Sequence, residues 1–222
     1  ARGDEVQIID NLSTGSMNNI SHLIDNDRFS YTIDTIMNEE IMRKLISECD
    51  IIYHLAAAVG VKLIIDEPIQ SLFTNILGTH IVLRLADSLG KKKVIIASTS
   101  EIYGKNGNVP YNEDDDRVLG PTTIYRWSYS TSKAVDEYMA LAYFKQERLP
   151  VIIVRFFNTV GERQTGRYGM VIPRFIRQAL AGEPITVYGD GKQSRCFAYV
   201  KDVVRGVIAL AEHPCAVGEV FN

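Results

Sequence analysis

Two side chains in the middle of the sequence could carry out proton transfer. Tyr129 and Lys133 are four residues apart, with serine and threonine between them. On a helix, residues i and i+4 share a face, so the Lys133 ammonium would lie beside the Tyr129 phenol and favour its ionised form. This predicts a Tyr129 pKa below its ordinary value of about 10, suited to taking a proton from an alcohol or giving one to a ketone. The same spacing also occurs by chance as a solvated pair on helix surfaces, so the surrounding sequence decides.

A second polar group follows the apolar run at 94–97. Thr99, Ser100 and Glu101 come directly after it. Hydroxyls and a carboxylate are costly to bury without partners, so this group indicates a polar ligand or a network within a turn. A hydroxyl here could hold a substrate alcohol.

Acidic and small residues follow three other apolar runs. Asp10 follows the run 6–9 and could accept hydrogen bonds from ribose hydroxyls of an adenosine, which would favour NAD over NADP, although a turn explains it equally well. Asp34 could bind an adenine amino group or sit as an acid at a helix start. Ala56 and Ala57 follow the run 50–55 and would let a flat cofactor approach the backbone, or would serve close helix–strand packing.

These residues need a scaffold, and the apolar pattern predicts one. Short, nearly continuous apolar runs predict buried strands at 6–9, 50–55, 94–97 and 151–154, with a weaker strand at 29–33. Helical spacing predicts helices at 39–49, 71–89 and 129–147. This alternation indicates an α/β fold, a Rossmann-like doubly wound parallel sheet that binds ligands at the carboxyl ends of its strands.

The two ends of the chain suggest a larger whole. The sequence opens without Met and reaches Gly3 as if a helix had just ended, so we expect the N-terminal strand and Gly-rich loop of such a sheet to be missing. Residues 1–160 are predicted to form the cofactor domain. Residues 161–222 are predicted to form a smaller, partial substrate lobe interleaved with it, with helices at 171–181 and 202–212 and a strand at 185–188.

Composition excludes several classes of protein. Lys and Arg total 24 against 27 Asp and Glu, so no basic field exists for nonspecific nucleic-acid binding. No apolar run approaches the roughly 20 residues of a membrane helix. The 3 cysteines contain no CxxC pair, which suits a reducing cytoplasm. We therefore predict a cytoplasmic protein with no nucleic-acid, membrane or metal partner.

Taken in order, the motifs resemble the extended short-chain dehydrogenase/reductase superfamily, in its NAD-dependent nucleotide-sugar epimerase/dehydratase branch. The resemblance runs nearly end to end and is carried by residues 10–15, 54–57, 74–79, 98–104, 129–133, 155–161 and 188–195. It implies NAD as cofactor, a nucleotide-diphosphate sugar such as a UDP-sugar as substrate, and a homodimer formed through two helices, although core packing explains the same apolar helix residues.

The resemblance also implies roles for individual residues. The catalytic residues would be Tyr129, Lys133, Thr99 and Glu101. The cofactor would be bound by Asp10, Asn11, Asp34, Leu55, Ala56, Ala57, Asn75 and Lys133. The substrate would be bound by Ser100, Asn158 and Arg195. Tyr129 would act as the base, Thr99 would bind the sugar 4-hydroxyl, and Asn75 would also support the active-site helix.

The implied reaction begins with oxidation at the sugar C4 to a 4-keto intermediate. The sequence Thr99-Ser100-Glu101 looks most like that of UDP-glucuronate decarboxylases and GDP-mannose 4,6-dehydratases, which favours a decarboxylase. UDP-glucose 4-epimerase and NDP-sugar 4,6-dehydratase activities stay open as alternatives. A non-catalytic NAD-binding sensor or scaffold is a further alternative, disfavoured because Tyr129 and Lys133 are both present.

Overall fold

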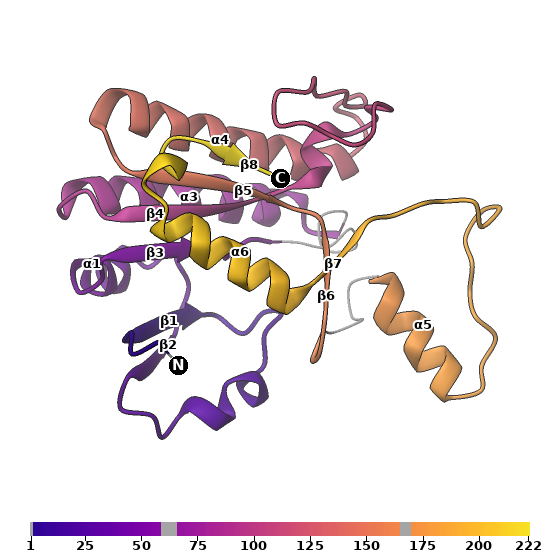
Figure 1. Ribbon diagram of the computed structural model, residues 1–222, viewed down its shortest axis with the longest axis horizontal. Helices are drawn as coiled ribbons and strands as arrows, with labels where there is room; N and C mark the ends of the chain where they lie inside the picture. Colours follow the sequence, from indigo (N-terminus) through magenta and orange to yellow (C-terminus); the bar gives the residue numbers. More distant parts are fainter. Residues whose placement is uncertain (1, 59–65, 165–169) are drawn as a thin grey trace.

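The computed structural model describes residues 2–58, 66–164 and 170–222, and strands and helices alternate along most of it (Figure 1). The strands are β1 (Val6–Asp10), β2 (Phe29–Ile33), β3 (Ile51–His54), β4 (Lys93–Thr99), β5 (Val151–Phe156), β6 (Asn158–Val160), β7 (Phe197–Tyr199) and β8 (Val220–Phe221). The longer helices are α1 (Glu39–Ser47), α3 (Pro68–Ser88), α4 (Arg126–Glu147), α5 (Val171–Leu180) and α6 (Val200–Glu212). The predicted α/β class is confirmed, and α4 begins one turn before the predicted start at 129.

The centre of the fold is a four-stranded parallel sheet in the order β3-β4-β5-β8. Side chains alternate between its two faces. Ile96 and Ile153 pack in a cluster with residues of α3 and α4, whereas Ile95 and Ile152 pack with residues of α6. Because helices cover both faces, β4 and β5 are buried on both sides, which explains their nearly continuous apolar sequences.

The predicted single sheet is divided among the described residues. β1 and β2 form a separate parallel pair, in register from Val6 opposite Phe29 to Asp10 opposite Ile33. β6 and β7 form a second parallel pair, which the sequence did not predict. The arrangement of parallel strands with helices on both faces is nevertheless the one expected.

The predicted strand at 185–188 is wrong. These residues form no strand, and Ile185, Val187 and Tyr188 are exposed. Their backbone runs beside α5 instead, where the Gln178 side chain donates to Thr186 Oγ1 (2.8 Å) and accepts from the Thr186 backbone N–H (3.1 Å). β-branched residues favour strands only where a neighbouring strand and a buried face are available.

Residues after 160 stay tied to the central sheet. α5 projects from the body of the molecule, whereas the later segments return to it (Figure 1). β7 pairs with β6, α6 packs on the sheet, and β8 adds to β5. The predicted division at residue 160 stays a prediction, and strands β7 and β8, which follow it, pair with β6 and β5, which precede it. In the described ranges, no helix is long and apolar enough to span a membrane.

Candidate active site

Tyr129 and Thr99 meet at the carboxyl edge of the central sheet. β4 ends at Thr99, and the first half of α4 brings Tyr129 to the same place. A hydrogen bond joins the two side chains, and each residue is 8% exposed. Thr99 Oγ1 also accepts the backbone N–H of Glu101 (3.2 Å), which caps the short 3-10 helix Ser100–Tyr103. The structure therefore brings together the predicted base and the predicted hydroxyl group.

Lys133 lies on the same helix, but its charge has another partner. Its Nζ lies 2.6 Å from Asp136 Oδ2, and the two side chains are 2% and 0% exposed. The pKa of Tyr129 is raised above its ordinary value, chiefly by burial and further by the charges of Glu101 and Asp136, while the Thr99 hydrogen bond opposes the shift. The expected lowering of this pKa is therefore wrong for this arrangement, because burial and the negative charges of Glu101 and Asp136 raise it.

Asn75 fastens the loop after β3 to the active-site helix. Its Oδ1 accepts the Ala58 backbone N–H (2.8 Å), and its Nδ2 donates to Ser132 Oγ (3.1 Å). Ser132 lies between Tyr129 and Lys133 on α4, so this bridge fixes the helix where the two predicted catalytic side chains arise. The geometry fits the supporting role expected of Asn75, and its contact with a cofactor stays a prediction.

A buried ion pair that sequence reasoning missed fixes α4 against the sheet. Arg155 Nε and Nη2 donate to the two carboxylate oxygens of Glu137 at 3.0 and 2.8 Å, and Ser98 Oγ donates to Glu137 Oε1 at 2.5 Å. Arg155 Nη1 donates to Tyr103 Oη (2.8 Å) and to the Glu113 carbonyl (2.7 Å). A charged residue inside the otherwise apolar run of β5 was the available signal, because such a charge needs a buried partner.

Asp10 and Asn11 lie on an exposed turn after β1. Asp10 Oδ1 accepts the Leu12 backbone N–H (2.7 Å), and Asn11 Oδ1 accepts that of Ser13 (3.0 Å). A Cβ on Gly15 would lie 3.1 Å from Asp10 Oδ1, so glycine lets the loop fold back over the carboxylate. Turn formation is thus observed, and nucleotide binding by these two residues stays a prediction.

The other predicted cofactor residues lie in two places, Asp34 just before α1 and residues 55–57 just after β3. The Asp34 carboxylate accepts the Thr35 backbone N–H (2.6 Å) and the Asn38 side chain (3.1 Å), which fits the alternative of an acid at the start of a helix. Leu55 and Ala56 are exposed at the end of β3, and Ala57 is half-buried. Short side chains at a strand end leave room for a flat group near the backbone, so this segment fits NAD.

A cavity of about 190 Å³ opens next to Thr99. Thr99, Ser100 and Glu101 line one side, and Asn158 contributes from β6. The pKa of Glu101 is raised by loss of hydration, and the nearby charge of Arg126 opposes this. The cavity is completed by residues of β5, β6, β7, α5 and the loop before α5, namely Phe156, Phe157, Thr159, Val160, Gln164, Met170, Val171, Ile172, Pro173 and Phe197.

Asn158 and Arg195 are placed near each other by the β6–β7 pair. Asn158 Nδ2 donates to the carbonyl of Cys196 (2.9 Å), the residue after Arg195. Arg195 is exposed and donates to the carbonyl of Ser194 (2.7 Å). Arg195 is absent from the lining of the 190 Å³ cavity, so its contact with a substrate diphosphate stays a prediction.

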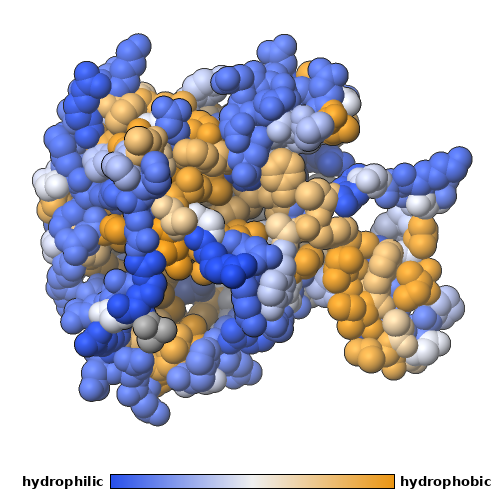
Figure 2. Space-filling model, in the orientation of Figure 1, coloured by the Kyte–Doolittle hydropathy of each residue, from blue (hydrophilic) through white to orange (hydrophobic). Residues whose placement is uncertain are grey.

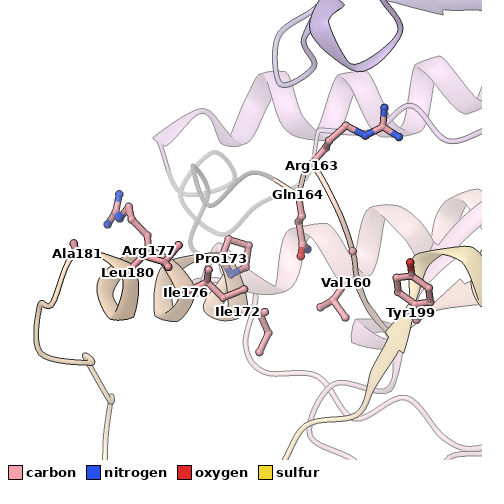
Figure 3. Close-up of a pocket in the computed structure, with 11 residues that line it drawn as sticks. Val160, Arg163, Gln164, Ile172, Pro173, Ile176, Arg177, Leu180, Ala181 and Tyr199 are labelled. Carbon is pink, nitrogen blue, oxygen red and sulfur yellow. The ribbon is translucent and has the colours of Figure 1, made fainter. Parts of the chain in front are cut away.

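A larger cavity of about 790 Å³ adjoins the first one along α5 (Figure 3). Val160, Gln164, Ile172 and Pro173 line both cavities. Hydrophobic residues gather on the surface over α5 (Figure 2). In Figure 3 Arg163 points away from α5, and its Nη1 donates to the carbonyl of Asn19 (2.9 Å).

Known proteins resemble the whole chain. A family model described as "NAD dependent epimerase/dehydratase family" matches residues 1–222. The chain is 45% identical over 222 residues to a UDP-N-acetyl-alpha-D-glucosaminuronate decarboxylase of Bacillus cytotoxicus, covering all of this chain and 67% of that protein. It is 40% identical over 211 residues to UDP-glucuronic acid decarboxylase 1 of Danio rerio, covering 94% of this chain and 48% of that protein.

The fold matches a solved enzyme that holds cofactor and sugar nucleotide. The structure of UDP-glucuronic acid 4-epimerase from Bacillus cereus, in complex with UDP-glucuronic acid and NAD, superposes with a TM-score of 0.86 at 31% identity. The match covers 97% of this chain and 68% of the epimerase. The chain thus spans about two thirds of its bacterial relatives and about half of the fish decarboxylase. On the family model and on these identities, the chain belongs to the NAD-dependent epimerase/dehydratase family.

Proposed function

We propose that the protein oxidises the C4 hydroxyl of a UDP-sugar acid and uses the resulting ketone to release the neighbouring carboxylate as CO₂. The observation that carries this proposal is the Tyr129–Thr99 hydrogen bond at the edge of the cavity that Glu101 also lines. A sugar C4 hydroxyl placed there meets a hydroxyl that can orient it and a phenol that can take its proton.

Each part of this reaction has a place in the site. Tyr129 takes the C4 hydroxyl proton, Thr99 orients the hydroxyl, and NAD, when bound, accepts the C4 hydride. The product is a C4 ketone. In a hexuronic acid the carboxylate on C5 is then β to the ketone, so its C–C bond breaks with the electron pair delocalised onto the ketone oxygen. A proton donor must then return a proton to C5, and we assign this role to Glu101, whose pKa is raised by loss of hydration. Return of the hydride to C4, with the proton held by Tyr129 returning to the C4 oxygen, would then reduce the ketone and give the pentose nucleotide.

The decarboxylase reading is favoured by relatives of this chain. The Bacillus cytotoxicus and Danio rerio relatives are both named as decarboxylases of UDP-sugar acids. A 4-epimerase is the second candidate, because the Bacillus cereus structure is a 4-epimerase that binds UDP-glucuronic acid. Both candidates share the oxidation at C4, and they differ in the fate of the ketone.

Product analysis separates these two candidates. The full-length protein would be incubated with NAD and either UDP-glucuronate or UDP-N-acetylglucosaminuronate, and CO₂ and nucleotide products measured by mass spectrometry. Release of CO₂ with a pentose nucleotide from either substrate supports decarboxylation. Conversion to a 4-epimer without CO₂ supports the second candidate. No conversion of either substrate contradicts both.

Tyr129→Phe tests the proton-transfer step within the same assay. We expect a loss of turnover of at least about 10²-fold, the lower range for removing a general acid or base, with unfolding little changed. Tyr138→Phe is the matched control, since Tyr138 lies on the same helix and is 67% exposed. Near-normal turnover of Tyr129→Phe would contradict the assignment.

We also propose that the protein forms a homodimer in the cytoplasm. Ile69, Phe73 and Leu77 recur every four residues on α3 and are exposed. A row of exposed apolar side chains on one helix face fits a helix of a second copy. The 3 cysteines of the sequence are all free, which suits a reducing compartment.

A further inference from the structure

We propose that Asp136 is a positioning residue that holds the buried ammonium of Lys133 in place and limits how strongly its charge acts on Tyr129. The proposal rests on the proposed function in one respect, that Tyr129 transfers a proton. Asp136 belongs to none of the motifs found in the sequence and takes no part in the proposed reaction, so this role is new.

The first observation is the depth of the ion pair. Lys133 Nζ and Asp136 Oδ2 are 2.6 Å apart, with side chains 2% and 0% exposed. Water cannot screen charges so enclosed, so the contact holds the two side chains in one geometry. Asp136 Oδ1 has no hydrogen-bond partner among the described residues, although it is buried. The Asp136 carboxylate is therefore oriented so that Oδ2 contacts Lys133, while Oδ1 is left without a close partner in the described part of the chain.

The second observation is the chain of contacts behind Asp136. Burial raises the pKa of the Asp136 carboxyl, and the charge of Lys133 and a hydrogen bond from Thr79 on α3 oppose this rise. The Thr79 hydroxyl also lies 3.0 Å from Nε2 of His54, at the end of β3. Thr79 and His54 are 0% and 4% exposed. A buried chain therefore runs from β3 through α3 to the active-site helix.

Hydrogen-bond donors and acceptors fix the direction of this chain. An ionised carboxylate only accepts, so Thr79 must donate its single proton to Asp136. The hydroxyl oxygen is then the acceptor for His54, which must carry a proton on Nε2. Burial, and next the charge of Lys133, lower the His54 pKa to about 3, so His54 is neutral at physiological pH. This series of hydrogen bonds therefore requires the Nε2-protonated tautomer of His54.

Several charges face this group from the elements around it. On α4, Glu137 acts on Asp136, and Asp136 acts on Tyr129. From the segment after β4, Glu101 acts on Tyr129 and is itself opposed by Arg126. Lys133 is the positive charge that acts on both Asp136 and His54. Within this set, Asp136 is the charge in direct contact with Lys133, so its removal most directly frees the Lys133 charge to stabilise the Tyr129 phenolate.

The pH profile of kcat/KM tests this role in the full-length enzyme. Asp136→Asn keeps the shape of the side chain and removes its charge. We expect the acid limb, where the Tyr129 proton is lost, to move down by about one pH unit, the effect of one charge roughly 10 Å away along a helix at an effective dielectric constant of about 20. Asp87→Asn is the matched control, because Asp87 pairs with Lys91 (2.8 Å) at the surface, near the end of α3.

The outcomes separate this proposal from the proposed function. An acid limb unchanged in Asp136→Asn, whether or not the plateau rate falls, would overturn the proposal and leave only a structural role for Asp136. Near-normal turnover of Tyr129→Phe would instead overturn the proposed function.

A second measurement needs no catalysis. Nitrogen-15 NMR of labelled histidine in the full-length protein reports the His54 tautomer, with His54→Asn identifying its signals. We expect the Nε2-protonated form and no ionisation between pH 5 and 8. Thr79→Val should remove this tautomer preference. An Nδ1-protonated His54 in the unaltered protein, or the same tautomer in Thr79→Val, would break the chain behind Asp136 and overturn the proposal.

Discussion

Replacing Arg155 with methionine should destabilise the protein far more than the loss of an ordinary ion pair. Arg155 is 8% exposed and forms two hydrogen bonds with the Glu137 carboxylate, at 3.0 and 2.8 Å. In Arg155→Met, Glu137 would stay buried with Ser98 as its remaining partner among the described residues. Tyr103 and the Glu113 carbonyl would each lose a donor.

The expected magnitude follows from burial. Removing one partner of a buried ion pair costs about 3–5 kcal/mol, because an uncompensated charge is left behind. Breaking an exposed pair costs about 1 kcal/mol or less. The hydrogen bonds and the charge of Glu137 raise the Arg155 pKa despite the burial that would lower it, so the guanidinium stays charged up to high pH. For a domain of this size, the melting temperature should fall by roughly 6–20 °C.

Urea unfolding followed by circular dichroism would measure the cost in the full-length protein. The control is Arg84→Met, which breaks the surface contact between Arg84 and Glu39 (2.6 Å, side chains 37% and 50% exposed). The double variant Glu137→Leu with Arg155→Met should recover part of the loss, since it removes the orphaned charge. A cost of Arg155→Met no greater than that of the control would refute this reasoning.

Two further predictions concern the cofactor and the assembly. Fluorescence titration of the full-length protein should show tighter binding of NAD than of NADP, and Asp10→Ser should narrow the difference, because the Asp10 carboxylate would repel a 2′-phosphate; tighter binding of NADP to the unaltered protein would contradict this. Sedimentation should show a dimer that the Phe73→Glu substitution dissociates. Phe73 is 54% exposed on the α3 face, so a glutamate there would bury a charge in the interface. Arg43→Glu on α1 is the control, and a monomeric unaltered protein would exclude this interface.

Burial decides which parts of this fold the sequence could predict. The runs at 94–97 and 151–154 lie within β4 and β5, which are covered on both faces, so their apolar composition reflects their place in the sheet. The run at 185–188 has similar composition but is exposed and forms no strand. Residues 158–160 and 197–199 form a strand pair that their composition did not reveal, because short, partly exposed strands are defined by their partners.

The site shows the same division between local spacing and tertiary contact. Helix periodicity placed Tyr129 and Lys133 on one face, and the order of motifs placed Thr99 beside them. Spacing could not determine which charge Lys133 would pair with. An acidic residue three positions further along the helix, Asp136, is also within reach, and contact at 2.6 Å between buried groups outweighs any more distant interaction. Burial is the main cause of the raised Tyr129 pKa, and the charges of Glu101 and Asp136 add to it.

Two consecutive carboxylates explain how the active-site helix is held. Successive residues of a helix point about 100° apart, so Asp136 and Glu137 face different neighbours. Asp136 faces Lys133 and Thr79 of α3, whereas Glu137 faces Ser98 of β4 and Arg155 of β5. The helix is therefore held on two sides, by the ion pair of Glu137 with Arg155 of the sheet and by the contact of Asp136 with Thr79 of α3. Ser98 directly precedes Thr99, so the contact that anchors Glu137 also sets the distance from the helix to the Thr99 hydroxyl, which hydrogen-bonds to Tyr129.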